Sequence, residues 1–257
     1  IVFGFLFVRI ERNTHDPLIP LHLFKNKDML LWDLMAFVGM GFYISFSVYI
    51  PMWAQGILLT SALAGGATQI PTAGLWYSGS RFGSYLSKKR NHHLTAVLAL
   101  SFALISTLVL LALGMTPNYA FFIIVGALLG IALGMLLTTS QVGVSEAVTS
   151  NDLAVATTLN RLFNTLGQTI MTAIYGLVFN IVVNHQATKL GLPSAKISGL
   201  TNSAVTSDSK AQLLIMHHVL FAGIKSVLIV AFILLLVALV LEIGNIHLTR
   251  IKKQPAQ

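Results

Sequence analysis

The amino-acid sequence predicts an all-α, polytopic membrane protein. Hydrophobic residues make up 55% of its 257 residues and charged residues only 9%, whereas a soluble domain carries about 25% charged residues. The mean hydropathy is +0.80, and the apolar residues gather in long runs. These observations exclude a soluble globule and predict transmembrane helices without a sheet.

Six apolar runs are long enough to cross the roughly 30 Å hydrocarbon core of a bilayer as helices. The chain opens in the middle of another apolar run, without a Met and without the charged start of a signal peptide. We therefore interpret residues 1–8 as the end of a preceding helix and the sequence as the C-terminal part of a longer protein. The predicted spans, within a bundle over 29–244, are about 29–53, 62–86, 94–114, 119–142, 157–183 and 217–243.

The polar segments predict the orientation, because Lys and Arg near span ends favour the cytoplasmic side. Residues 9–28 are expected to form a cytoplasmic linker and residues 245–257 a basic cytoplasmic tail. The net charge of +8 follows from this topology and does not indicate nucleic-acid binding. In this orientation the cytoplasmic side carries Arg9, Arg12, Lys25, Lys27, Lys88, Lys89, Arg90, Arg250, Lys252 and Lys253, and the outside carries Lys189, Lys196 and Lys210.

Proline and glycine predict how the spans bend and pack. Pro71 removes one backbone hydrogen bond and is expected to kink the second span. Gly126, Gly130 and Gly134 recur at every fourth position of the fourth span, so they share one helical face. Such a face lets a neighbouring helix approach closely.

The fifth span has a polar face, which in a membrane helix must lie against protein or water. We therefore predict a substrate cavity lined by Asn160, Arg161, Asn164, Gln168 and Thr172, with Gln141 from the fourth span. The alternatives are a snorkelling Arg161 and amides that only hold helix packing. At about 100° per residue, an arc of about 120° contains Thr157, Asn160, Arg161, Asn164, Gln168, Thr172 and Tyr175, opposite Leu159, Leu162, Phe163, Leu166, Ile170, Ala173 and Leu177.

Other polar residues in the spans have competing interpretations. Asp33 is either a protonatable coupling site or an interfacial carboxylate, and its place within one or two turns of the inner boundary favours the second. The pairs His92-His93 and His217-His218 do not predict a metal site, because adjacent helical residues diverge by about 100°. The chain has no Cys, no nucleotide-binding loop and no hydrolase motif. We therefore expect neither an enzyme nor a metal or other cofactor.

The turn after the second span carries a degenerate motif. Gly83, Leu86, Ser87, Lys88 and Arg90 resemble the loop between the second and third helices of each half of a major facilitator transporter, roughly Gly-x-Leu-x-Asp-Arg-x-Gly-Arg-Arg. Ser87 replaces the acidic residue. The resemblance implies a cytoplasmic gate motif, and the alternative is a topology anchor alone. The residues concerned are Arg81, Gly83, Lys88, Lys89 and Arg90.

Nearly the whole chain resembles the C-terminal part of the fourteen-helix drug:proton antiporter branch of that superfamily. Asn164 to Gln168, Asn-Thr-Leu-Gly-Gln, lies where the family often has Arg-Gln-Leu-Gly-Gly, so Asn164 departs from the usual arginine. The other stretches are the basic turn Gly83–Arg90, Pro51–Gly66 followed by Pro71, and a linker with Glu11, Arg12, Pro17, Leu18, Leu23, Phe24 and Lys25.

This resemblance implies a C-terminal six-helix bundle whose third and sixth spans lie at the periphery, while the second and fifth face a missing N-terminal half. It also implies a proton-coupled secondary transporter that exports drug-like or amphipathic compounds across a bacterial plasma membrane. The expected partners are a small-molecule substrate, protons, the lipid bilayer and the missing half. The alternatives are a non-transporting scaffold or half-protein, and a facilitator-family transporter of another small solute.

Overall fold

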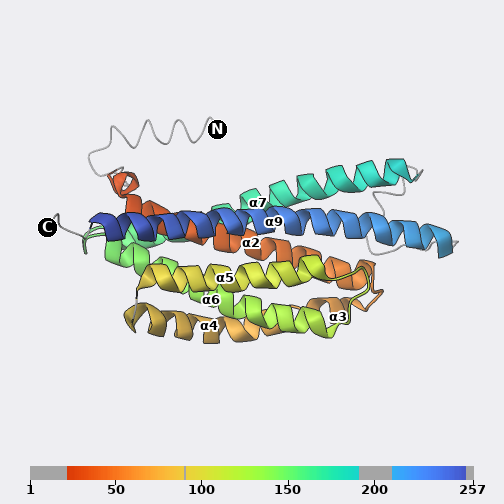
Figure 1. The fold of residues 1–257 in the computed structure, drawn as a ribbon, viewed down its shortest axis with the longest axis horizontal. Helices are drawn as coiled ribbons and strands as arrows, with labels where there is room; N and C mark the ends of the chain where they lie inside the picture. Colours follow the sequence, from red (N-terminus) through yellow and green to blue (C-terminus); the bar gives the residue numbers. More distant parts are fainter. Residues whose placement is uncertain (1–21, 90, 191–209, 253–257) are drawn as a thin grey trace.

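The computed structural model describes residues 22–89, 91–190 and 210–252, and these ranges form a bundle of long helices without strands (Figure 1). The predicted all-α class is confirmed. Residues 1–21, Arg90, 191–209 and 253–257, which include several predicted linker, loop and tail residues, lie outside the described part. The elements are a short 3-10 helix, η1 (Leu23–Lys25), and the helices α2 (Lys27–Gly56), α3 (Ala62–Ala67), α4 (Ile70–Lys89), α5 (His92–Ala112), α6 (Ala120–Ala147), α7 (Leu153–Lys189) and α9 (Lys210–Lys252).

Five helices in the described part, α2, α5, α6, α7 and α9, are long and apolar enough to cross a membrane. The protein is therefore a polytopic membrane protein. α4 is not among the five. α7 and α9 extend beyond the predicted spans 157–183 and 217–243, and the predicted tail is helical as far as Lys252.

The single helix predicted over residues 62–86 is broken into α3 and α4. Thr68 ends α3, and its Oγ1 donates a hydrogen bond of 2.7 Å to the carbonyl of Gly65. Pro71 is the second residue of α4, where a missing N–H costs little because the first N–H groups of a helix have no intrahelical partner. The chain is thus interrupted before Pro71, and the kink predicted at this proline is replaced by the start of a helix.

Close backbone packing holds α4 against α6. A Cβ added to Gly130 or Gly134 of α6 would collide with the backbone of α4. From the α4 side, a Cβ on Gly83 would lie 2.8 Å from Met135 Cα. Gly126 faces the same seam, because its carbonyl accepts a hydrogen bond of 2.9 Å from Thr72 Oγ1. The structure therefore places all three glycines of α6 against α4, where small residues allow extensive van der Waals contact.

α2 forms the centre of the bundle and packs against α6, α7 and α9. α5 packs against α6 and α9, and α4 and α7 lie along opposite sides in the view of Figure 1. α2 begins, α4 ends and α5 begins at the same end of the bundle, which carries Lys27, Lys88 and Lys89. We term it the basic end, and the other the opposite end.

Candidate functional site

α7 lies on α2 through a seam of small residues. A Cβ on Gly167 of α7 would collide with the carbonyl of Phe37, and a Cβ on Gly41 of α2 would lie 2.6 Å from Met171 Cγ. This close approach fixes the rotation of α7 about its axis. Asn160, Gly167, Met171 and Tyr175 are among the residues of α7 that are buried as a result.

A buried polar cluster joins α2, α6 and α7 near the basic end. It consists of Asp33, Ser140 and Asn160, and we term it the carboxylate cluster. Asn160 Nδ2 lies 2.9 Å from Asp33 Oδ1 and 3.0 Å from Ser140 Oγ. Ser140 Oγ in turn donates to the carbonyl of Trp32 at 2.7 Å. Three helices are therefore linked through one amide and one hydroxyl group.

Asp33 is enclosed by neighbouring helices. The sequence favoured an interfacial carboxylate near the inner boundary, and the structure adds that its side chain is 0% exposed, because α6 and α7 cover this part of α2. Asp33 Oδ2 has no hydrogen-bond partner in the described part of the chain. Periodicity indicated Asn160 as a cavity residue; that its amide binds Asp33 could not be read from the sequence.

The other predicted cavity residues of α7 do not join the carboxylate cluster. Asn164 and Gln168 are half-buried at the edge of the seam, and Asn164 Oδ1 is buried without a partner among the residues that the structure describes. Arg161 and Thr172 are exposed, although Thr172 Oγ1 donates a hydrogen bond of 2.6 Å to the carbonyl of Gln168. The polar face is thus divided between an inward amide, two residues at the edge and two outward residues.

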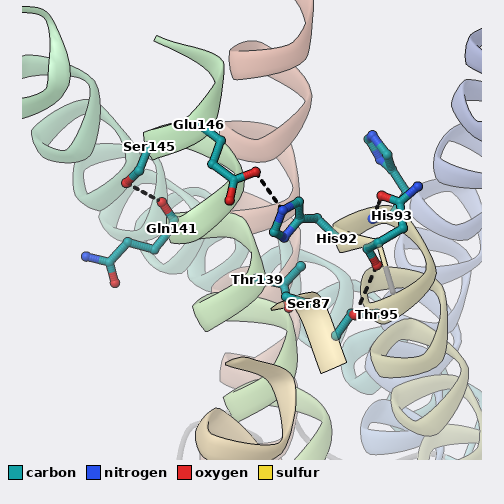
Figure 2. A network of polar contacts seen from close by, with 9 residues as sticks. Ser87, His92, His93, Thr95, Thr139, Gln141, Ser145 and Glu146 are labelled. Carbon is teal, nitrogen blue, oxygen red and sulfur yellow. Dashed lines mark hydrogen bonds and ion pairs between the residues drawn. The ribbon is translucent and has the colours of Figure 1, made fainter. Parts of the chain in front are cut away.

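Gln141 of α6 is also exposed, and its side chain extends away from Ser87 and His92 (Figure 2). Its carbonyl accepts a hydrogen bond of 2.9 Å from Ser145 Oγ. No hydrogen bond joins its side chain to the predicted cavity residues of α7 within the described ranges. The structure therefore does not bring Gln141 into the same contact network.

The apolar side of α7 is exposed as well. Leu162 is 44% exposed and Leu166 38% exposed, and Ile170 and Leu177 also face outward. Leu159, predicted on the same arc, is instead buried against the bundle. In the described structure, α7 therefore has an uncovered apolar strip and, beside it, an uncovered polar strip with Arg161 and Thr172.

The basic turn forms a second exposed polar region, on α4. Arg81 and Lys88 line a shallow, open depression of about 380 Å³ with Ser80, Ser84 and Tyr85. Arg81 also lies 5.9 Å from the centre of the Tyr77 ring. No carboxylate within the described ranges forms an ion pair with these basic side chains.

The position where the family motif has an acid is buried here. Ser87 Oγ lies 3.3 Å from Thr139 Oγ1 of α6, so this residue ties α4 to α6. Gly83 faces the same helix, Lys89 is exposed and donates to Tyr85 Oη at 3.3 Å, and Arg90 lies outside the described residues.

Two histidines at the start of α5 bind carboxylates from different helices. His92 Nε2 lies 2.6 Å from Glu146 Oε2 on α6 (Figure 2), and His93 Nδ1 lies 2.7 Å from Glu242 Oε1 on α9. The His93 ring stacks on Trp32, with ring centres 4.9 Å apart. From the sequence, only a metal site was considered for this pair, and the divergence of adjacent residues argued against it. In the structure, the diverging side chains connect α5 to α6 and α9.

At the opposite end, Lys225 of α9 closes the C-terminus of α5. Its Nζ donates hydrogen bonds to the carbonyls of Leu110, Leu111 and Leu113, at 2.9, 2.6 and 2.7 Å. Carbonyls at a helix C-terminus have no intrahelical donor and carry partial negative charge. This contact was also missed, because nothing in the sequence relates residue 225 to the end of α5.

Comparison with known proteins identifies the class. A sequence profile described as Major Facilitator Superfamily matches residues 6–172, which is more than half of the chain. The chain therefore belongs to the Major Facilitator Superfamily, a family of membrane transporters and not of enzymes.

Individual relatives are distant and include proteins named for drug transport. The chain is 26% identical to "Multidrug transporter protein MdtP" of Bacillus subtilis (strain 168), over 68% of this chain and 32% of the relative. It is 28% identical to "Multidrug resistance protein 3" of the same bacterium, over 69% and 35%. Identity to "MFS-type transporter ppz2" of Metarhizium majus (strain ARSEF 297) is 27%, over 88% and 42%. The chain thus spans about a third to two fifths of these relatives.

Proposed function

We propose that this chain is the C-terminal part of a transporter of the fourteen-helix drug:proton antiporter branch. The complete protein would export drug-like or amphipathic compounds across a bacterial plasma membrane in exchange for protons, with its C-terminus in the cytoplasm. The names of the two Bacillus relatives support the substrate class. Their greater length is consistent with an N-terminal half from outside these 257 residues.

The polar strip of α7 beside the carboxylate cluster carries this proposal. Secondary transporters hold substrates near the bilayer midplane between repeats, where helix faces are polar or broken. Asn164 and Gln168 would contact the substrate or its waters, and Arg161, nearer the basic end, would supply charge at the inner gate. Thr172 and Gln141 would extend the polar lining towards either end.

The exposed side of α4 supports the same arrangement. Ile70, Tyr77 and Tyr85 are more than half exposed, which leaves a large apolar and aromatic surface uncovered. A missing half lying across α4 and α7 would cover it. Arg81 and Lys88 would then be close enough to the interface to act as a cytoplasmic gate.

Dye efflux from cells that contain the complete transporter tests the proposal. The readout is gradient-dependent efflux of ethidium, with the amount of protein in the membrane measured in parallel. We expect Asn164→Leu and Gln168→Leu to reduce efflux without lowering the amount of protein. Unchanged efflux in the double variant would assign both amides to helix packing. Transport of a different solute would retain the family but replace the substrate class, and no transport at all would favour a scaffold.

Leu162→Asn is the matched substitution on the apolar strip of the same helix. It places an amide against lipid or close packing, so it should lower the amount of protein in the membrane and leave efflux per molecule unchanged. Reduced efflux at a normal amount of protein would mean that the apolar strip, and not the polar strip, faces the substrate.

A further inference from the structure

Asp33 is held in a site that satisfies only half of its carboxylate. One oxygen accepts a hydrogen bond from Asn160, and the other is buried without a partner among the described residues. Burying an ionised carboxylate without a cation costs several kcal/mol, whereas burying a neutral carboxyl group costs much less. The packed cluster therefore favours the protonated acid over the ion.

No neighbouring cation offsets the charge within the described part of the chain. The other charged groups of α2, α6, α7 and α9 whose side chains the structure describes at this end are either exposed or paired with a histidine. Arg161 of α7 is exposed, as is Asp28 of α2 itself. At the same end, His92 pairs with Glu146 and His93 pairs with Glu242.

Glu242 is the other buried carboxylate at this end, and its setting differs. It is 0% exposed and one of its oxygens also lacks a partner among the described residues, but the other faces the ring of His93 at 2.7 Å. Glu242 thus has a basic ring as its partner. Within the described part of the chain, the hydrogen-bond partner of Asp33 is a neutral amide.

The amide that binds Asp33 belongs to the helix that carries the proposed substrate residues. Asn164 and Gln168 follow Asn160 by one and two helical turns, about 6 and 12 Å along the axis at 1.5 Å per residue. A movement of α7 that engages these side chains would also displace the Asn160 amide. Substrate contact and the environment of the carboxyl group are thus connected through one rigid element.

We propose that Asp33 is the group that binds the exchanged proton. In the packed state described here, Oδ2 holds the proton through an O–H bond. When the substrate draws α7 away from α2, water reaches the carboxyl group, the O–H bond breaks and the proton passes to that water. The packed state forms again when a proton from the opposite side of the membrane binds the carboxylate. This assignment rests on the proposed function, and it adds the residue that couples the two fluxes.

Proton release on dye binding tests the assignment. The purified complete transporter is placed in weakly buffered detergent solution with a pH-indicating dye, and ethidium is added. The unsubstituted protein should release protons as it binds ethidium. Asp33→Asn should bind ethidium but lose this release and lose gradient-driven efflux in vesicles. Asp28→Asn, an exposed acid on the same helix, and Glu242→Gln should retain the release.

Each outcome separates the assignment from the proposed function. Undiminished proton release by Asp33→Asn, or its loss in Glu242→Gln alone, overturns the assignment while ethidium transport stands. Failure of the unsubstituted protein to transport ethidium overturns the proposed function and this assignment with it. If Asp33→Asn does not accumulate, Asp33→Glu keeps a carboxyl group. Its carboxylic-acid band in the ethidium-induced infrared difference spectrum should then be shifted from that of the unsubstituted protein, and an unshifted band overturns the assignment.

Discussion

Lys225 and Asp33 are ionisable side chains inside candidate membrane spans, at opposite ends of the bundle, and their surroundings differ. The Lys225 ammonium group donates to three carbonyls and lies 5.4 Å from the Trp53 ring centre and 5.0 Å from that of Phe221. Asp33 accepts from one amide and has one oxygen without a partner in the described structure.

This difference separates a charged group that holds the fold together from a group suited to gain and lose a proton. Each N–H of Lys225 meets an oxygen that needs a donor, so the side chain is placed as a cap of the helix end. The surroundings of Asp33 suit a neutral carboxyl group, because they offer a hydrogen bond to only one of the two oxygens of a carboxylate. Charged residues within membrane helices are expensive and usually functional, but the contacts around Lys225 show that one can serve as a helix cap.

The largest expected effect belongs to a buried pair that loses one partner. His93→Leu leaves both oxygens of Glu242 without a hydrogen bond among the described residues, and an unsatisfied buried polar group costs about 1–3 kcal/mol, more if it is charged. The thermal unfolding midpoint of the detergent-solubilised protein should fall strongly. The double variant with Glu242→Leu should recover much of the loss, and equal midpoints for the single and double variants would contradict this reasoning.

Lys225→Met should come next. It retains the aliphatic stem but removes the cation that caps α5, and hydrogen bonds to charged groups contribute about 1.5–3 kcal/mol. We expect a lower unfolding midpoint with normal dye-induced proton release. Lys189→Met, at an exposed position near the end of α7, is the control and should unfold like the unsubstituted protein. Loss of proton release in Lys225→Met would give this lysine a functional role and end the distinction from Asp33.

Asn160→Leu should destabilise the protein less, by about 1–2 kcal/mol, which is typical of interhelical hydrogen bonds in membranes. The substitution removes the donor to both Asp33 and Ser140. Because these residues share one network, the effects of Asn160→Leu and Asp33→Asn should not add. Unfolding midpoints for the two single variants and the double variant measure this coupling, and strict additivity would show that the cluster does not act as a unit.

The smallest effect on stability is expected for Asp33→Asn. The amide has nearly the shape of the carboxyl group and carries no charge, so the unfolding midpoint should stay the same or rise. The sign is opposite to that for Lys225→Met, although both substitutions remove one charge. A fall in the midpoint as large as that of Lys225→Met would mean that the Asp33 carboxylate stabilises the fold.

The sequence by itself determined the class of structure and much of the packing chemistry. Long apolar runs with few charges leave helices as the spanning form, because hydrocarbon offers no partners to backbone N–H and C=O groups. The four-residue spacing of Gly126, Gly130 and Gly134 indicated a close helix contact, since spacing along a helix fixes which residues share a face. The polar arc of the fifth span followed from the same periodicity.

Only the tertiary structure decided where the helices break and which residues meet. The interruption before Pro71 depends on contacts of Thr68 and on the packing of α4 against α6. Asp33 and Asn160 are 127 positions apart, and each lies on a helix whose rotation is set by neighbours. Periodicity gives a side chain's direction relative to its own helix axis, whereas a site between helices requires the rotation and depth of every helix. Those are fixed by close packing across the bundle, which is why the enclosure of Asp33 by α6 and α7 could not be read from its place in the sequence.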